Sequence, residues 1–401
     1  MHVLLIHQVF VTPDRGGGTR HYEFARMLVA RGHRVTVIAS DVDYLTGRKI
    51  SGSREAMWDG VWVKYVRTLG GVHRSFLTRA VSFMSFAISS LSEALQVRGV
   101  DVVWGTSPPL FQALTAVIVA HFKQVPFVFE VRDLWVDFMW QLGILRSSIL
   151  FAVLKAVEQI AYRSANVVMV NSPGFVPYVR KSIQNVNIRV VPNGVTSADF
   201  VVSPGTRERE RDTLGLGNTF TALYLGNIGV ANDIEVIVEA ASLLAEAAIT
   251  FLFVGGGITS AKLRKMAQLR NLRNVIVHET VPKVRVPAII AASDVCIATL
   301  RDIPLFATTY PNKVFDYMAG GRPVVLAIDG AIRAVVENAR AGVFVPPGNH
   351  QALADAIRKY RDDPELAEQH GRNGREYIAL HFERSVVVNQ LESVLLEIVQ
   401  R

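Results

Sequence analysis

The chain has 401 residues, half of them hydrophobic, and a formal net charge of +8 at pH 7. This length exceeds what one ordinary core accommodates and predicts two or three domains, and the apolar content excludes a disordered protein. The single cysteine, Cys296, excludes an internal disulfide and fits a reducing cytoplasm.

The excess of positive over negative charge is confined to the first half of the chain. Residues 1–200 contain 21 Lys and Arg against 13 Asp and Glu, whereas residues 201–401 contain 22 of each. No RNP, zinc-finger or basic-helix pattern accompanies this excess, so we expect no nucleic acid partner. An anionic ligand or an anionic lipid surface is the favoured interpretation, and an ordinary solvated basic surface is the alternative.

No segment has the length of a transmembrane helix. The most apolar windows, 110–122 and 80–92, hold roughly 13 residues between charges, against roughly 20 for a membrane span. The first residues, MHVLLIHQVF, lack signal-peptide features and predict a buried strand. Residues 72–91 and 140–159 are apolar with interspersed Arg or Lys, which suits either a membrane contact or a helix buried between layers. We expect a cytoplasmic protein that can bind peripherally at the inner face of the cell membrane.

Short apolar runs alternate with amphipathic segments along the first half. Six runs predict strands: HVLLIH, RVTVIAS, DVVWGT, FVFEVRD, NVVMVNS and IRVVPNG. They are nearly free of polar residues, as expected of parallel strands that are covered on both faces. Helix-period segments such as 22–31, closed by Gly32, lie between them and predict right-handed β-α-β units in a doubly wound sheet.

The pattern lapses at residues 196–219, which are polar, charged and rich in turn formers, and we place a linker there. Six further runs follow: TALYLGN, ITFLFVGGG, NVIVHE, DVCIATL, RPVVLAI and GVFVPP. The sequence therefore predicts an α/β protein with two Rossmann-like domains, residues 1–195 and 220–374. The stretch 375–401 is helical in period and can pack on either domain.

Three consecutive glycines, Gly16 to Gly18, precede the first expected helix, for which Thr19 is a suitable N-cap. At the carboxyl edge of the sheet, beside a helix N-terminus, such a loop lets an anion or a sugar approach the backbone. A mobile turn is the alternative. About eight residues separate the glycines from the strand, so they are not the dinucleotide fingerprint, which needs its glycines directly after the strand.

The stretch FVGGGITS imitates that fingerprint more closely. Gly255 and Gly257 follow a strand, and Glu279 lies near the spacing of a ribose-binding carboxylate. Because Ser260 stands where the third glycine or alanine belongs, a nicotinamide enzyme is disfavoured.

A metal site is not indicated. Asp41 and Asp43 have the Asp-x-Asp spacing that many sugar transferases use for a divalent metal, but an acidic turn after a strand is ordinary. The histidines show no paired-ligand spacing, and one cysteine cannot build a thiolate site. We expect no metal and no cofactor.

Residues 308–328, TTYPNKVFDYMAGGRPVVLAI, carry the most information. Pro311 is expected to open a helix that Gly320 closes, with Lys313 and Asp316 in its first turns. A lysine at a helix N-terminus is not stabilised by the helix dipole. Its position therefore indicates that it binds an anionic group of a ligand.

In this order, the motifs resemble the GT-B glycosyltransferases of family 4, which are retaining nucleotide-sugar transferases. The likeness spans essentially the whole chain and rests on GGGTRHYEFARMLVARGHRVTVIA, VRDLW, VVPNGV, LYLGNIG, FLFVGGG and PNKVFDYMAGGRPVV. The variants HQ, GGGTRHYE and VRDLW are most similar to bacterial transferases, aminosugar transferases among them, that build O-antigen, capsule or exopolysaccharide repeats on a polyprenyl-diphosphate carrier.

The resemblance implies the GT-B fold, in which two Rossmann-like β/α/β domains face each other across a cleft. The first domain would bind a glycan or lipid-linked acceptor and the second a nucleotide-sugar donor, which this likeness predicts to be a UDP-sugar. The C-terminal helix within 375–401 would cross back to the first domain.

The same resemblance, together with the glycine loop, yields the candidate site residues. The catalytic candidates are Gly17, Gly18, His21, Arg132 and Asp133. The donor-binding candidates are Gly226, Asn227, Gly255, Gly256, His278, Lys313 and Asp316. Among these, Asp316 matches the family's second acidic residue, whose carboxylate holds the donor ribose hydroxyls, and Gly226 matches the glycine beneath the donor phosphates.

Three departures from the family pattern stand out. The Arg and Lys that usually grip the diphosphate fall at Asn227 and Asn232, the first acidic residue falls at Thr308, and the histidine of the usual His-Asp falls at Arg132. Arg132 or Lys313 would have to supply the missing cation.

Retention, which the family implies, lets the leaving diphosphate take the acceptor proton, so that no dedicated base is required. Two other functions stay open. A nucleotide-sugar epimerase can share this fold and would need acid/base groups, for which the motifs offer His21 and Asp133. The departures also allow an inactive transferase-like scaffold.

Overall fold

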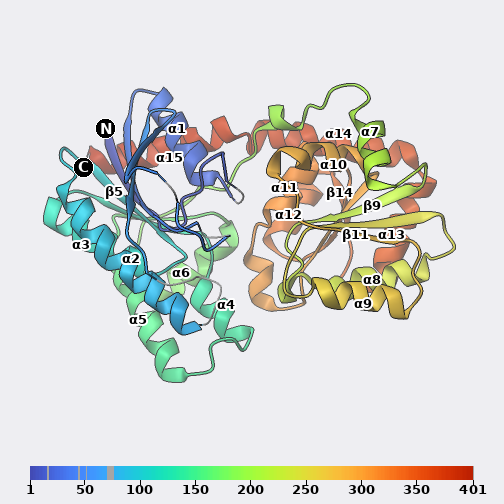
Figure 1. The fold of residues 1–401 in the computed structure, drawn as a ribbon, viewed down its shortest axis with the longest axis horizontal. Coiled ribbons are helices and arrows are strands. Elements are labelled where there is room, and N and C mark those ends of the chain that lie inside the picture. Colours follow the sequence, from blue (N-terminus) through green and yellow to red (C-terminus); the bar gives the residue numbers. More distant parts are fainter. Residues whose placement is uncertain (16–17, 44–45, 51, 70–75, 401) are drawn as a thin grey trace. The chain divides into compact units, whose positions relative to one another are not determined.

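The computed structural model describes residues 1–15, 18–43, 46–50, 52–69 and 76–400. The chain divides into two compact units, Met1–Pro192 with Val387–Arg401 and Asn193–Val386. Each unit is a Rossmann-like layered structure with helices packed on its own sheet (Figure 1).

The first unit is built on an eight-stranded sheet. Its strands are β1 (His2–Ile6), β2 (Arg34–Ser40), β3 (Glu55–Trp58), β4 (Val61–Val66), β5 (Val102–Ser107), β6 (Phe127–Val131), β7 (Val167–Val170) and β8 (Ile188–Val190). They lie in the order β3-β4-β2-β1-β5-β6-β7-β8, and only the β3–β4 pair is antiparallel. Every residue of β1, β5, β6 and β7 is buried, as parallel strands covered on both faces require. The six strands expected in this half are confirmed.

The hairpin β3–β4 was not predicted. Its strands are short, and β4 alternates between buried and exposed residues instead of forming an apolar run. The turn between them is Asp59-Gly60, with φ of 45° and 81°. A two-residue Asp-Gly turn with positive φ is a typical hairpin connection, and this dipeptide was the signal that could have identified the pair.

The helices of the first unit are α1 (Arg20–Ala30), α2 (Phe76–Gln96), α3 (Phe111–Lys123), α4 (Trp135–Gln141), α5 (Ser148–Ser164), α6 (Val176–Ser182) and most of α15 (Arg384–Val399). Helix α15 packs into the same core as β1 and β5, through Val387, Leu391 and Leu395. On its surface Glu392 binds Arg31, with 2.6 Å between the charged atoms. The C-terminal helix therefore forms part of the first unit. Within the described ranges, no helix has the length and apolar character to cross a membrane.

The second unit is built on a six-stranded sheet in which all neighbouring strands are parallel. Its strands are β9 (Phe220–Leu225), β10 (Ile249–Val254), β11 (Val275–His278), β12 (Val295–Thr299), β13 (Val324–Ala327) and β14 (Gly342–Phe344), in the order β11-β10-β9-β12-β13-β14. All six match the expected runs. The two faces of the sheet enter different cores, since Leu223 and Leu225 pack on one side and Ala222 and Tyr224 on the other.

The helices of the second unit are α7 (Thr206–Leu214), α8 (Ile234–Leu243), α9 (Ser260–Leu269), α10 (Val286–Ala292), α11 (Asn312–Ala319), α12 (Ala331–Ala339), α13 (His350–Asp362) and α14 (Pro364–His381). Helix α11 begins directly after Pro311 and ends at Gly320, as its sequence predicts.

Residues 196–219 are a folded part of the second unit and not the linker that their polarity suggests. They contain α7, and the division between the units lies at Pro192–Asn193. Buried Arg211 donates hydrogen bonds to the carbonyls of Gly217, Thr219 and Ala292. Leu214 is buried as well. A charged helix with one internal arginine thus resembles a linker in composition only.

The strand order locates a binding edge in each sheet. In the first sheet the chain proceeds from β1 to β2 on one side and later continues with β5 on the other; β9 and β12 are the corresponding neighbours in the second sheet. In open parallel sheets, ligands bind at the carboxyl ends of strands where the order reverses. The loops after β1, β5, β9 and β12 are therefore the places to look for a site.

Candidate active site

Arg20 and His21, in the first turn of α1, share one buried carboxylate in the first unit. The Glu130 carboxylate, in β6, lies 2.8 Å from Arg20 Nη2 and 2.6 Å from His21 Nε2. Burial alone would raise the pKa of Glu130, but its neighbours His21 and Arg20 hold that pKa well below its usual value. Burial lowers the pKa of His21 to about 4, although Glu130 acts against it. At neutral pH an uncharged His21 therefore donates its Nε2–H to an ionised Glu130.

His7, in the HQ motif, is a functional candidate that was not among the predicted site residues. It follows β1 directly, and its ring centre lies 4.2 Å from that of His21. Both ring nitrogens are buried and have no hydrogen-bond partner in the described part of the chain. Burial, together with His21 and Arg132, holds the pKa of His7 well below its usual value. A neutral imidazole of this kind can still donate to or accept from a ligand hydroxyl. Its position at the end of β1 and its place in the HQ motif were the signals that could have identified it.

Arg132 and Asp133 follow β6 at the same edge of the sheet. Arg132 donates its Nε–H to the Thr106 hydroxyl, at 2.9 Å, and its Nη2 to the Pro108 carbonyl, at 2.5 Å. The guanidinium is therefore held against the end of β5 and the loop that follows. Burial raises the pKa of Asp133 to about 7, against the opposing effect of Arg132. A carboxyl group with that pKa can exchange a proton near neutral pH.

The structure gives less support for a role of the glycine loop, Gly16 to Gly18. Gly16 and Gly17 lie outside the described residues. At Gly18 a Cβ would meet nothing within 4 Å, so packing does not explain that glycine. Thr19 occupies the N-cap position of α1, but its side chain makes no capping hydrogen bond. Contact between this loop and a ligand stays a prediction.

In the second unit, Lys313 buries its ammonium at the carboxyl edge of the sheet. Nζ lies 3.8 Å from the centre of the Tyr224 ring and has no hydrogen-bond partner among the described residues. It also lies 3.5 Å from the position that a Cβ on Gly226 would occupy. Burial lowers the pKa of Lys313 to about 7. An ammonium held only by an aromatic face is poorly compensated, so this point favours an anion.

Helix α11 is fixed at this edge by Tyr317, one turn beyond Lys313. The Tyr317 hydroxyl accepts a hydrogen bond from the Leu225 amide, at 2.8 Å, and donates to the Leu225 carbonyl, at 3.2 Å. Asp316 lies beside Tyr317, and burial raises the pKa of its carboxyl to about 6, although Lys283 and Arg384 act against the shift. The helix thus presents the Lys313 cation near the end of β9, and the Asp316 carboxyl follows three residues later on the same helix.

The glycines after β10 support the loop after β9. Gly226 N donates to Val254 O and Ile228 N donates to Gly256 O, both at 2.9 Å, so the two loops run side by side. A Cβ on Gly255 would collide with the Gly226 carbonyl, and one on Gly256 would lie 2.8 Å from the Thr280 hydroxyl. Close backbone packing therefore explains these glycines. Contact with a donor is not needed to explain them and stays a prediction for Gly255 and Gly256.

Two further candidates lie at the same edge. Asn227 is exposed, and its carbonyl accepts a hydrogen bond from the Tyr224 hydroxyl at 2.7 Å. His278 ends β11, and its Nε2 is buried without a partner among the described residues.

Arg301, two residues beyond the end of β12, is a cation that was not among the predicted site residues. Thr308, at a usual acidic position, uses its hydroxyl to bind the Leu305 carbonyl.

The Asp-x-Asp pair makes the local contacts of an acidic turn. Asp41 accepts a hydrogen bond from the Thr68 amide, and Asp43 accepts one from the Thr46 amide. Over the described ranges, no group of three or more His, Cys, Asp or Glu is arranged to hold a metal ion.

Comparison with known families assigns each half of the chain. Residues 15–194 match the "Glycosyl transferase 4-like domain" and residues 219–363 match "Glycosyl transferases group 1". Among curated proteins, the chain is 27% identical over 407 residues to WcaI of Escherichia coli (strain K12), which is named as a glycosyl transferase of colanic acid biosynthesis. That alignment covers 96% of this chain and 98% of WcaI.

Solved structures show the same fold. Sucrose-phosphate synthase from Thermosynechococcus elongatus aligns with a TM-score of 0.80 at 18% identity, over 99% of this chain and 98% of that one. Anabaena HepE in complex with UDP aligns with a TM-score of 0.74 at 16% identity, over 99% of this chain and all of HepE.

Proposed function

Because the chain belongs to the group 1, family 4 glycosyltransferases of GT-B fold, we propose that it transfers a sugar from a UDP-sugar to a glycan or polyprenyl-diphosphate-linked acceptor. The transfer would retain the anomeric configuration, need no metal and serve bacterial surface polysaccharide synthesis. The name of WcaI supports the pathway class, and the UDP bound to HepE supports the donor class.

The observation that carries this proposal is the buried ammonium of Lys313 beside Gly226, for which the described residues provide no hydrogen-bond partner. Breaking the bond between the anomeric carbon and the diphosphate places negative charge on the leaving group. A fixed cation in a site of low dielectric stabilises that charge without reorganisation. We assign this role to Lys313, and we assign to Asp316 the binding of the ribose hydroxyls.

The chemical step balances without a dedicated base. The acceptor hydroxyl oxygen bonds to the anomeric carbon on the face from which the diphosphate departs. The carbon–oxygen bond to the diphosphate breaks, and the hydroxyl proton passes to a diphosphate oxygen. Lys313 neutralises the leaving group, so a metal ion is not required in this scheme. In the first unit we assign buried His7 and half-buried Asp133 to binding of the acceptor, since both have hydrogen-bonding capacity at the sheet edge.

A lipid-linked acceptor would bring the protein to a membrane surface. Helices α2 and α5 expose large apolar side chains, among them Ile88 at 69% and Ile149 at 77%. Together with the excess of positive charge in residues 1–200, this exposure favours docking on anionic lipid at the inner face of the cell membrane.

Incubation with a panel of nucleotide sugars and lipid-linked acceptors, in EDTA, tests the proposal. Free nucleotide with a glycosylated acceptor of unchanged anomeric configuration is the expected result. Interconverted donors would indicate an epimerase, and no reaction with any donor would favour an inactive scaffold. Activity that EDTA abolishes and Mg²⁺ restores would refute the metal-free scheme.

A further inference from the structure

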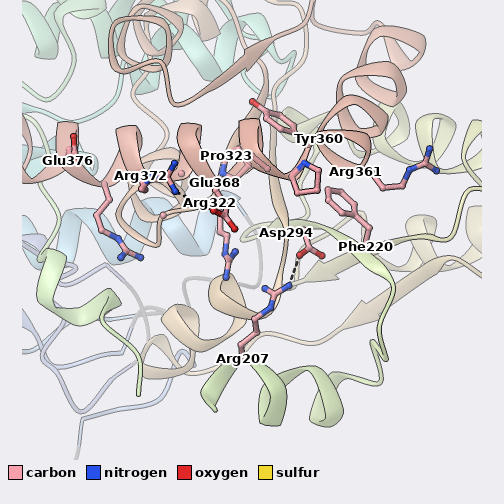
Figure 2. A pocket seen from close by; sticks show the side chains of 15 residues that line it. Arg207, Phe220, Asp294, Arg322, Pro323, Tyr360, Arg361, Glu368, Arg372 and Glu376 are labelled. Carbon is pink, nitrogen blue, oxygen red and sulfur yellow. Dashed lines mark hydrogen bonds and ion pairs between the residues drawn. The ribbon is translucent and has the colours of Figure 1, made fainter. Parts of the chain in front are cut away.

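A cavity of about 580 Å³ lies within the second unit, at the edge of the sheet opposite to Lys313. Its walls include residues at the amino ends of strands, such as Phe220 at the start of β9, Asp294 before β12 and Arg322 before β13. Helix α14 forms one wall, and Arg207 of α7 enters from another side (Figure 2). The cavity is therefore separate from the donor-site candidates at the carboxyl edge.

Arginine dominates the charge of this cavity. Its lining includes five arginines, Arg207, Arg322, Arg361, Arg372 and Arg375, against three carboxylates, Asp294, Glu368 and Glu376.

One of the three carboxylates in the lining, Asp294, already has partners. Asp294 lies 2.5 Å from Arg207 and also accepts the Thr221 amide. Arg322 and Arg375 form no ion pair in the described part of the chain. Two guanidinium groups thus line the cavity without a carboxylate partner.

Arg322 is half-buried in the wall of the cavity. One of its nitrogens donates to the Ala291 carbonyl at 2.6 Å, but its buried Nε has no acceptor among the described residues. Burial lowers the pKa of Arg322, and the charges of Arg207 and Arg375 act in the same direction. In Figure 2 the guanidinium groups of Arg322 and Arg207 lie near each other below α14. Arg207 is already paired with Asp294, so an anion beside Arg322 would compensate a guanidinium that has no ion pair among the described residues.

The other walls of the cavity are apolar and can pack against a ring of a ligand. Phe220, Tyr360, Pro323 and Pro364 provide apolar surface around the arginines. The volume lies in the range of small-molecule sites, and arginine binds phosphate oxygens in a bidentate manner. A small ligand with a phosphate group and a ring matches both features.

Arg375 links this cavity to the donor-site helix. Its Nε and Nη2 donate to the carbonyls of Ala319 and Gly320, at 3.3 and 3.2 Å, at the C-terminal end of α11. Gly321, with φ of 68°, leaves room for this contact, because a Cβ there would lie 2.7 Å from Nη2. Lys313 stands in the first turn of the same helix. A ligand that binds Arg375 therefore competes with the hydrogen bonds that Arg375 makes to the C-terminal end of α11, the helix that carries Lys313.

We propose that this arginine cavity is a regulatory site for a small phosphate-bearing molecule, a phosphorylated sugar or a nucleotide, and that its occupancy changes nucleotide-diphosphate binding through α11. The coupling rests on the proposed function, whereas binding in the cavity does not.

Calorimetric titrations in phosphate-free buffer test the binding. The ligands are inorganic phosphate, glucose 6-phosphate and AMP, which lacks the uracil base of the proposed donor, with glucose as the uncharged control. We expect saturable binding of at least one phosphate compound to the wild-type protein. Preference for glucose 6-phosphate or for AMP tells a sugar phosphate from a nucleotide.

The variants separate the two sites. Arg375→Gln, at an exposed position, should weaken this binding at least tenfold, and so should Arg322→Gln if that variant folds. Arg358→Gln, which removes a pair with Asp355 outside the cavity, and Lys313→Ala should leave it unchanged. Absence of saturable binding, equal affinity in Arg375→Gln, or loss of binding in Lys313→Ala would overturn the proposal.

The coupling has its own readout. With the cavity saturated, the UDP affinity of the wild-type protein should change at least threefold, and that of Arg375→Gln should not. An unchanged UDP affinity in the wild-type protein would refute the regulatory role. If the chain transferred no sugar, binding in the cavity would still be measurable, so failure of the proposed function is distinguishable from failure of this one.

Discussion

The ammonium of Lys313 lies 3.8 Å from the centre of the Tyr224 ring, and the described part of the chain offers its Nζ no hydrogen-bond acceptor. A cation–π contact compensates only part of the lost hydration of a buried ammonium. The position therefore weakens the fold slightly and favours an anionic ligand.

Replacement of Lys313 by Ala should weaken UDP binding by about 1–3 kcal/mol, the scale of a lost charge-assisted hydrogen bond. Uridine, which has no phosphate, should bind both proteins equally. Calorimetry with UDP and uridine measures the difference, and Lys265→Ala, at an exposed position of α9, is the matched control. Equal losses for UDP and uridine would show that Lys313 supports the fold or the base and not the phosphates.

UDP binding should take up protons at pH 8. In the ligand-free protein the pKa of Lys313 is about 7, so most Lys313 side chains are neutral at pH 8. The bound diphosphate raises this pKa. Asp316, with a pKa of about 6, is ionised at pH 8 in either state. The binding enthalpy in Tris and in HEPES should therefore differ, with uptake approaching one proton per site. The same enthalpy in both buffers, or uptake that persists in Lys313→Ala, would contradict the assignment.

Lys313→Met should stabilise the ligand-free protein. The folded-state pKa of about 7 is below the ordinary value of 10.5, so the unfolded chain binds more protons between these values and stability rises with pH in that window. Removing the amine should increase the free energy of unfolding by about 1–3 kcal/mol at pH 7 and flatten the rise toward pH 9. Urea unfolding at both pH values measures this, and a destabilised Met variant would refute the burial argument.

Glu130→Gln should destabilise the first unit by about 3 kcal/mol, because Arg20 would keep a buried charge without its carboxylate partner. Glu392→Gln, which affects the more exposed pair with Arg31, should cost about 1 kcal/mol or less. Thermal unfolding of both variants gives the comparison. Equal effects would show that the Glu130 cluster contributes no more than a surface pair.

Liposome binding should depend on α5. The double variant Ile149→Ser and Val153→Ser removes two exposed apolar side chains, with exposures of 77% and 52%, and should reduce cosedimentation with anionic vesicles at low salt at least threefold. Ile258→Ser, at a highly exposed position of the second unit, is the control. High salt should weaken the binding. Binding that is indifferent to lipid charge would contradict the membrane interpretation.

The alternation of apolar runs and helical segments determined the twelve predicted strands, the parallel sheets and the bounds of α11, because these patterns are local. The same reasoning missed β3 and β4, whose alternating residues and Asp59-Gly60 turn follow the hairpin pattern instead. It also took α7 for part of a linker, since the burial of Arg211 depends on carbonyls far along the chain, such as that of Ala292.

For the candidate site as well, some features followed from the sequence and others depended on tertiary packing. The sequence by itself placed Lys313 at a helix N-terminus and Asp133 after a strand, and the order of the motifs identified the family. Only the tertiary structure decided that the Lys313 ammonium meets the Tyr224 ring, that the His7 ring packs against that of His21, and that Arg207, Arg322 and Arg375 line one cavity. Such contacts depend on how strands and helices distant in sequence pack together. A motif specifies its own backbone and chemistry, but burial and neighbouring charges, which set the pKa of a side chain and its hydrogen-bond partners, arise when separate elements close into one core.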